Sequence, residues 1–191
     1  PVSIVLYKNI PIGAGMGGGS SDGAFTLKLL NDFFSLGLTN ERLAEYAIKL
    51  GSDCPFFIYN KPCIAEGRGE ILKEFTGLSL KNLYLIVVKP PSNVSTAEAY
   101  SKIKPLVPEI KLSEVLKMPV YEWKNYLFND FEKTVFPSHK EIENIKINMY
   151  NQGALYSSMS GSGSTVFGIF PNQISLYSGH SDYLEWGQWL D

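Results

Sequence analysis

The sequence is poor in the residues that bind metals and cross-link secreted domains, with two cysteines and two histidines among its 191 residues. Cys54 and Cys63 form no metal-ligand spacing with His139 and His180, so no cysteine–histidine metal motif is present. We interpret both cysteines as reduced thiols, because a disulfide is the rarer state of cysteine in a reducing compartment. A cytoplasmic protein without a bound structural metal is therefore expected.

Long apolar runs and an excess of charge are also missing. The sequence has no stretch of about 18 apolar residues, so no segment is predicted to span a membrane. It does not open with the pattern of a secretory signal peptide. The formal net charge of −2 leaves no basic excess to neutralise phosphates, so we expect neither a nucleic-acid nor a membrane partner. The 45% of hydrophobic and 19% of charged residues are ordinary for a globular protein.

Glycine is abundant near the start of the chain, where residues 11–24 read Pro-Ile-Gly-Ala-Gly-Met-Gly-Gly-Gly-Ser-Ser-Asp-Gly-Ala. The β-branched run Val2–Leu6 before them is typical of a strand, and apolar residues at helical spacing predict a helix over residues 21–35. Glycines allow positive φ angles and the close approach of an anion. The first amides of a helix stabilise a phosphate. We interpret the segment as a nucleotide phosphate cradle, in which Ser20 and Ser21 cap the helix or donate to phosphate oxygens.

Other loops compete for this interpretation. A lysine-bearing P-loop ends in Gly-Lys-Ser/Thr, whereas here Gly19 is followed by two serines, so that hypothesis fails. The dinucleotide-binding fingerprint matches at Gly13, Gly15 and Gly18, but it requires a strand after the helix, and the sequence predicts a second helix there. A flexible glycine–serine linker suits the composition but not the ordered flanks.

Residues 11–24 resemble the phosphate loop of the GHMP kinases, a family that includes galactokinase, homoserine kinase and mevalonate kinase. The resemblance implies ATP as co-substrate with Mg²⁺, and the transfer of a phosphoryl group to an alcohol. The ATP-binding residues that it implies are Pro11, Ile12, Gly13, Ala14, Gly15, Met16, Gly17, Gly18, Gly19, Ser20 and Ser21.

The candidate catalytic residue is Asp53, in the run Gly-Ser-Asp-Cys-Pro-Phe-Phe at residues 51–57. Asp53 suits the N-cap of a short helix, because Pro55 fits the first helical turn. It also suits an acid held at a turn, where it accepts a proton from a substrate hydroxyl. The run is similar to the segment that carries the catalytic aspartate in one branch of the GHMP kinases. The resemblance therefore implies that Asp53 is the general base, a role that capping does not exclude.

Two further segments are candidates for substrate contacts. Residues 63–72 predict a β-hairpin whose turn needs a glycine at positive φ. The segment resembles one that lines the substrate pocket in the family, which implies that Gly67 and Arg68 lie near the substrate diphosphate; a solvated turn arginine is the alternative. Ser95 or Thr96 is predicted to cap a helix. The family has a Val-Ser-Thr segment here, which implies that Thr96 also touches substrate.

The second half of the chain predicts a frame for these segments. Residues 83–88 form the strongest strand pattern, and residues 154–170 predict a hairpin with a glycine–serine turn. The latter resembles the third GHMP kinase motif, which implies that its turn approaches the phosphate loop. Residues 121–151 predict helices divided at Pro137. Within them, Asn129–Glu132 is expected to have a packing and capping role.

The resemblance implies an α+β GHMP kinase fold. Residues 1–80 would be the C-terminal part of the ribosomal-protein-S5-like N-terminal domain, which binds ATP, and residues 81–191 a ferredoxin-like C-terminal domain. The active site would occupy the cleft between them. The family's catalytic lysine and cytosine-stacking aromatic residues would lie upstream of Pro1, so the chain taken alone is expected to have little or no kinase activity.

The branch of the family that the chain resembles most phosphorylates the 2-hydroxyl of a cytidylyl diphosphate of methylerythritol, in the non-mevalonate route to isoprenoid precursors. Two alternatives remain open at the level of sequence. One is a homoserine or mevalonate type of GHMP kinase, and the other is a nucleotide-binding fragment that lacks catalysis. The protein is expected to be a monomer or a homodimer.

Overall fold

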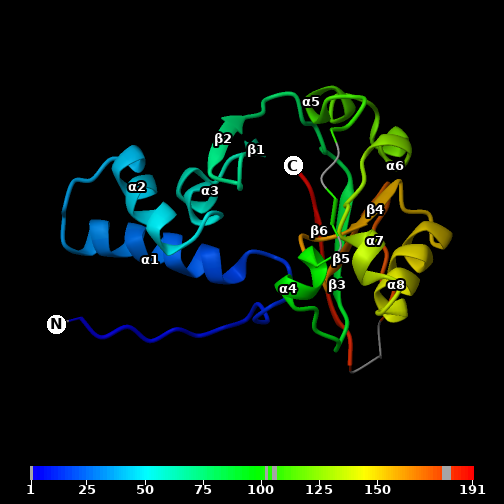
Figure 1. The fold of residues 1–191 in the computed structure, drawn as a ribbon, viewed down its shortest axis with the longest axis horizontal. Helices are drawn as coiled ribbons and strands as arrows, with labels where there is room; N and C mark the ends of the chain where they lie inside the picture. The colour runs from blue at the N-terminus through cyan, green and yellow to red at the C-terminus, as the bar shows by residue number, and fades with distance from the viewer. Residues whose placement is uncertain (1, 102, 105–106, 178–181) are drawn as a thin grey trace.

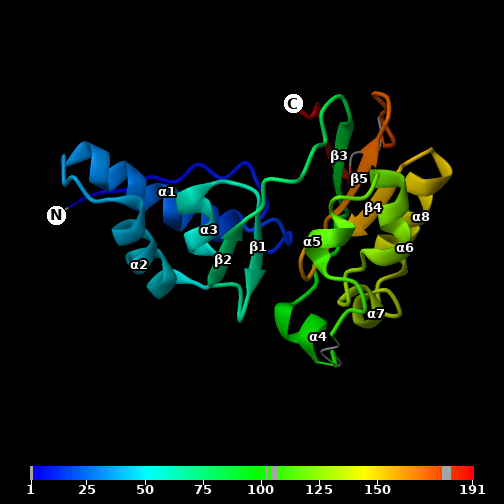
Figure 2. The ribbon, with the colours of Figure 1, turned by 90° about the horizontal axis from the view of Figure 1, so that it is seen from above.

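The computed structural model describes residues 2–101, 103–104, 107–177 and 182–191. Figures 1 and 2 show two groups of elements, one built mainly of helices and the other around a sheet. We call the elements from α1 to β2 the N-terminal lobe and those from β3 to β6 the C-terminal lobe. Helices and antiparallel strands are thus segregated along the chain, which confirms the α+β class.

The N-terminal lobe is a group of helices with a short hairpin. Its elements are α1 (Gly18–Phe33), α2 (Asn40–Leu50), α3 (Cys54–Tyr59), β1 (Cys63–Glu66) and β2 (Ile71–Glu74). The helices bury Ala24, Leu43 and Ala47 together with Cys54 and Ile58 of α3. The strands pair in antiparallel fashion, so the predicted hairpin at residues 63–72 is confirmed.

A four-stranded antiparallel sheet forms the centre of the C-terminal lobe. Its strands are β3 (Tyr84–Lys89), β4 (Tyr156–Met159), β5 (Val166–Phe170) and β6 (Leu184–Trp189), in the order β4-β5-β3-β6. The strong strand pattern at residues 83–88 and the predicted hairpin at residues 154–170 are both confirmed. Alternate side chains of the central strands enter different clusters, because successive residues of a strand point to opposite faces.

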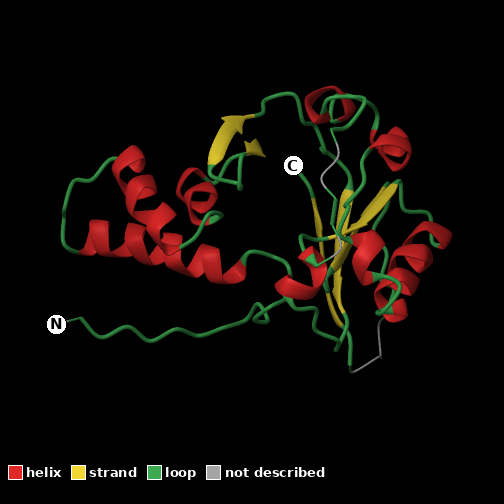
Figure 3. Cartoon of the chain, viewed as in Figure 1, coloured by secondary structure: helices red, strands yellow, loops and turns green. Residues whose placement is uncertain are grey.

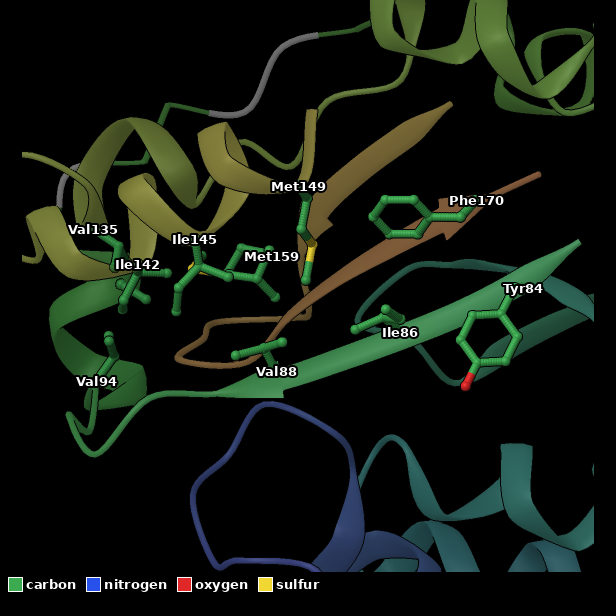
Figure 4. Close-up of a cluster of buried hydrophobic side chains, with 12 residues drawn as sticks. Tyr84, Ile86, Val88, Val94, Val135, Ile142, Ile145, Met149, Met159 and Phe170 are labelled. Atoms are coloured by element: carbon green, nitrogen blue, oxygen red, sulfur yellow. The ribbon is translucent and has the colours of Figure 1, made fainter. Parts of the chain in front are cut away.

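Helices cover both faces of this sheet. One face carries α4 (Thr96–Tyr100), α7 (Glu132–Val135) and α8 (Lys140–Asn151). Figure 4 shows side chains of α7 and α8 lying over Ile86, Val88 and Phe170. The other face packs on α5 (Leu112–Val115), the short 3₁₀ helix η1 (Val120–Glu122) and α6 (Trp123–Tyr126), with Trp123 against Tyr156.

The first residues depart from the expectation of a strand. Val2–Leu6 form no strand in the described chain, and Figure 3 draws the whole segment before α1 as loop. Val5 is 94% exposed. A strand forms only when its backbone can pair with a neighbouring strand, and no described strand lies beside this segment. Its residues therefore favour a strand but do not form one.

Helix α1 begins three residues before the predicted start. Its N-cap is Gly17 at φ 65°, without a side-chain cap bond, so neither Ser20 nor Ser21 caps the helix, and the alternative, donation to phosphate oxygens, stays a prediction. The glycines allow the helix to start early, because Gly17 adopts the left-handed conformation that a serine would resist. None of the described helices combines the length and the apolar character that crossing a bilayer requires.

Candidate active site

The glycine loop (residues 11–17) connects the exposed N-terminal segment to α1. Gly13, Gly15 and Gly17 have φ angles of 71°, 75° and 65°. The backbone thus follows a path that side chains disfavour, and it delivers the first amides of α1 beside the loop. An anion held at this place is stabilised both by unpaired N–H groups and by the helix dipole.

A second turn, the serine turn (residues 160–165, between β4 and β5), rests directly on the glycine loop. The Ser160 hydroxyl donates to the Gly15 carbonyl at 2.7 Å, and the Thr165 amide donates to the Ala14 carbonyl at 3.2 Å. A Cβ atom on Gly15 would lie 2.4 Å from the Ser160 carbonyl oxygen, so the approach requires glycine. The prediction that the third motif approaches the phosphate loop is confirmed.

A cavity of about 480 Å³ opens where these turns meet. Its walls are residues 11–20 and Asp22, the side chains of Leu6 and Lys8, Asp53, Val94 and Thr96, and the serine-turn residues Gly161 and Ser162. The structure therefore brings together the glycine-rich segment, the candidate base and one of the predicted substrate residues. Of the predicted ATP-binding residues, Ser21 lies outside these walls and donates its amide to the Gly17 carbonyl at 2.9 Å.

Asp53 stands at the N-cap position of α3, next to the cavity. Its backbone is helical, with φ −87° and ψ −12°, and its side chain caps none of the amides of this described helix. Pro55 fills the first turn as predicted. The Asp53 carboxylate is exposed and belongs to the cavity wall, so it is available to a ligand. A Cβ atom on Gly69 would lie 3.2 Å from Asp53 Oδ1, so the turn of the β1–β2 hairpin closes one side of the carboxylate.

Lys8 and Asp22 also belong to the site, although no motif predicted a role for either residue. Lys8 forms an ion pair with Asp22 in the first turns of α1, and its Nζ would lie 3.5 Å from a Cβ atom on Gly18. Among the described residues that line the cavity, Lys8 is the one cation. Its signal in the sequence was a basic residue three positions before the loop, which carries little information unless the pairing with Asp22 is known.

The substrate residues predicted in the hairpin turn lie outside the cavity wall. Gly67 has the expected positive φ, at 70°. The Arg68 side chain is 85% exposed, and its Nε stands 3.8 Å from Glu70 Oε1. The Glu70 carboxylate accepts the Arg68 amide at 2.6 Å, and backbone hydrogen bonds from Glu70 itself and from Arg68 hold the pKa of Glu70 below its usual range. The contacts of Gly67 and Arg68 with substrate remain predictions.

Thr96 does not cap α4, although the sequence allowed either Ser95 or Thr96 as the cap. Ser95 is the N-cap of α4, and its hydroxyl accepts the Glu98 amide at 3.0 Å. Thr96 is exposed and lines the cavity. The loop before it is fixed by Lys89, whose buried ammonium donates to the Ser92 carbonyl at 2.8 Å. Desolvation lowers the pKa of Lys89.

The donors around the cavity suit a nucleotide with its magnesium ion. Mg²⁺ commonly uses one or two carboxylates together with phosphate oxygens. Asp22 and Asp53 are the carboxylates of the wall, and Ser20 adds a hydroxyl. No cluster of three histidine, cysteine, aspartate or glutamate side chains able to hold a metal ion occurs within the described ranges. This donor set fits an ion that arrives with phosphates better than an ion held by protein alone.

Comparisons with known proteins agree with this geometry. Residues 1–61 match the family description "GHMP kinases N terminal domain", and residues 112–177 match "GHMP kinases C terminal". A Bacteroides fragilis protein named 4-diphosphocytidyl-2-C-methyl-D-erythritol kinase is 58% identical over 170 residues, which cover 89% of this chain and 62% of that protein. A Parabacteroides distasonis protein of the same name is 51% identical over 188 residues, which cover 97% of this chain and 69% of that protein.

Solved structures of kinases also resemble this chain. A crystal structure of 4-(cytidine 5'-diphospho)-2C-methyl-D-erythritol kinase superposes with a TM-score of 0.70 at 31% identity, covering 85% of this chain and 59% of that chain. Homoserine kinase from Cytophaga hutchinsonii, with a TM-score of 0.53 and 22% identity, shares the fold; 87% of this chain and 59% of that chain are covered. The chain spans 62% of the length of the Bacteroides fragilis relative.

Proposed function

Because the chain belongs to the GHMP kinase family, we propose that it contributes the ATP site and the catalytic base of a kinase. The proposed substrate is 4-diphosphocytidyl-2-C-methyl-D-erythritol, phosphorylated at its 2-hydroxyl for isoprenoid precursor synthesis. The names of the similar proteins support this substrate. The observation that carries the proposal is the shared cavity of the glycine loop, the first turn of α1 and the Asp53 carboxylate.

The proposed mechanism follows from the placement of these groups. Amides of the glycine loop and of the first turn of α1 hold the β- and γ-phosphates of ATP. Asp53 orients the substrate hydroxyl and accepts its proton while the hydroxyl oxygen bonds to the γ-phosphorus. The bond from that phosphorus to the bridging oxygen breaks, and ADP leaves. Mg²⁺ would neutralise phosphate charge, held by Asp22 and the Ser20 hydroxyl.

Lys8 has a place in the same mechanism. Lys8 lines the cavity, and its ammonium pairs with the Asp22 carboxylate. A triphosphate bound against α1 brings several negative charges within reach of this ammonium, which favours binding. Thr96 lines the cavity and is a candidate for a hydroxyl contact with substrate.

A coupled assay of ADP release, with and without the cytidylyl substrate, tests the proposal. Asp53→Asn keeps the shape of the side chain and removes the base, and we expect turnover to fall about 10²–10⁴-fold. Asp32→Asn, an exposed position near the end of α1, is the matched control and should leave turnover unchanged. Equal turnover of Asp53→Asn and the unaltered protein would refute the assignment of the base.

The assay also separates the alternatives. Homoserine or mevalonate as the better acceptor would indicate another GHMP kinase. Binding of ATP without turnover would indicate a nucleotide-binding fragment. We expect weak turnover for the 191-residue chain, which spans 62% of the length of the Bacteroides fragilis relative, and higher turnover for that relative, so equal turnover of the two would contradict this expectation.

The cellular setting and assembly are part of the proposal. Cys54 and Cys63 are free thiols, and partial burial raises the pKa of Cys63, which favours the protonated thiol. Free thiols of this kind are usual in the cytoplasm, where we place the protein. A monomer or a homodimer remains the expected assembly, and light scattering of the purified protein distinguishes the two.

A further inference from the structure

The segment Asn129–Glu132, which follows α6 and ends at the first residue of α7, contacts the end of β4 through two side chains. The sequence analysis gave this segment only a packing and capping role. In the structure the side chains of Asn129 and Glu132 bind the backbone that leads into the serine turn, about thirty residues later in the chain. The segment therefore has a connection to the candidate active site that its position in the sequence does not suggest.

Every polar atom of the Asn129 side chain is engaged. Its Nδ2 donates to the carbonyls of Met159 and Gly161, both at 2.8 Å. Its Oδ1 accepts the Phe131 amide at 3.0 Å, which fixes the orientation of the side-chain amide. The two carbonyls that it binds lie on either side of Ser160, so Asn129 sets the direction in which the chain leaves β4.

Glu132 binds the same backbone through a different atom of Met159. The residue is 8% exposed, and its Oε1 accepts the Met159 amide at 2.8 Å. Its Oε2 accepts from Lys146 of α8 at 2.5 Å, so the buried charge is paired. Met159 is thus bound through its amide by Glu132 and through its carbonyl by Asn129.

The position of the serine turn determines the shape of the glycine loop. Ser160 binds the Gly15 carbonyl, and a Cβ atom on Gly161 would lie 3.1 Å from the same oxygen. These are contacts between backbones at close range, which leave little room for independent movement. A shift of the turn would therefore shift Gly15 and the amides that follow it.

We propose that Asn129 and Glu132 are positioning residues for the nucleotide site, which act by holding the serine turn against the glycine loop. They contact neither ATP nor the acceptor in this proposal. Their effect on ATP binding rests on the proposed function, whereas their effect on the contact between the turn and the loop does not. The two effects are measured separately.

The first test is Asn129→Asp. The substitution keeps the acceptor for the Phe131 amide, removes both donors and places a charge against two carbonyl oxygens. Hydrogen exchange at the Thr165 amide, which bonds to Ala14, should become faster in the folded protein. Calorimetry should show about tenfold weaker binding of a non-hydrolysable ATP analogue. Asn144→Asp, at an exposed site on α8, is the matched control and should change neither.

The second test compares two variants of Glu132. Glu132→Gln keeps an acceptor for the Met159 amide, whereas Glu132→Ala removes it. We expect Glu132→Gln to keep the affinity for the analogue within about twofold of the unaltered protein, and Glu132→Ala to lose about tenfold. A purely structural role predicts lower melting temperatures with unchanged Thr165 exchange and unchanged affinity in the folded variants, and that outcome would overturn the proposal.

Failure of the proposed function gives a different result. If the unaltered protein binds no nucleotide, the ATP site is wrong, but Asn129→Asp must still accelerate exchange at Thr165. If the analogue binds normally to Asn129→Asp while exchange accelerates, the turn is held as described but does not position the nucleotide site, and the proposal is wrong.

Discussion

Gly15 lies directly against the serine turn of the C-terminal lobe. Its φ of 75° and the clash of a Cβ atom with the Ser160 and Gly163 carbonyl oxygens, at 2.4 Å and 2.6 Å, give two separate reasons for glycine. The sequence predicted the first reason, because glycine-rich loops need positive φ. It could not predict the second, because the partner is about 145 residues away.

Gly15→Ala is therefore predicted to destabilise the protein. The conformational term alone is about 1–2 kcal/mol, and the contact with the serine turn adds to it. Gly19→Ala is the comparison, because Gly19 lies in α1 with nothing within 4 Å of the added Cβ atom. We expect Gly19→Ala to stabilise the protein by up to about 1 kcal/mol. Denaturant unfolding measures both changes, and similar values for the two would contradict the structure.

At the scale of elements, the pattern of the sequence identified those that bury a face. The hairpin at residues 63–72, the strand at residues 83–88 and the hairpin at residues 154–170 were predicted because apolar runs and glycine-containing turns are local signals. Val2–Leu6 has the same composition as a strand but is exposed, because pairing depends on a neighbour that composition does not reveal. The same holds for the site. A local motif predicted Asp53, whereas the Lys8–Asp22 ion pair became evident only in the folded structure.

The turn of the β1–β2 hairpin is expected to respond to pH through Glu70. Its pKa is lowered by hydrogen bonds from backbone amides, so the ionised form stabilises the turn. This stabilisation is complete above the usual pKa of a glutamate and is lost as the pH falls through the lower pKa of the folded state. The Arg68 amide, which donates to Glu70, should therefore titrate in NMR spectra with a midpoint below the usual range.

Glu70→Gln is the control for that titration. It retains an acceptor for the Arg68 amide but cannot ionise, so the acid-induced change in the Arg68 signal should disappear. Persistence of the change in Glu70→Gln would assign it to another group. If the Arg68 amide signal of the parent protein titrates with the usual midpoint of a glutamate, the backbone hydrogen bonds do not favour the ionised form of Glu70.

At the scale of the whole molecule, the lobes have separate hydrophobic cores. The cluster around Cys54 and Ile58 belongs to the N-terminal lobe, while the other two clusters flank the sheet. The N-terminal cluster is small, and Leu29, Phe33 and Leu50 around it are at least 60% exposed. The relatives are longer than this chain, so the cores of the complete relatives need not be divided in this way.

We predict that the N-terminal lobe of this chain unfolds at a lower denaturant concentration than the C-terminal lobe. Cys54 is 3% exposed in the N-terminal core, and all three tryptophans, Trp123, Trp186 and Trp189, lie in the C-terminal lobe. In a Cys63→Ser background, thiol labelling of Cys54 should therefore precede the change in tryptophan fluorescence. Coincident transitions would show a single cooperative unit.

The junction of the two lobes has a consequence for how this sequence can diverge. The Ser160 hydroxyl and the Thr165 amide both donate to backbone carbonyl oxygens of the glycine loop. Every amino acid has such a carbonyl. The side chain of Ala14 therefore takes no part in this pairing, but Ala14 is 3% exposed and has room only for a small residue, and a Cβ atom on Gly15 would collide with the serine turn. Over evolutionary time we expect the interface to conserve its backbone path and the glycine at position 15, and to tolerate more substitution where side chains do not enter the contact.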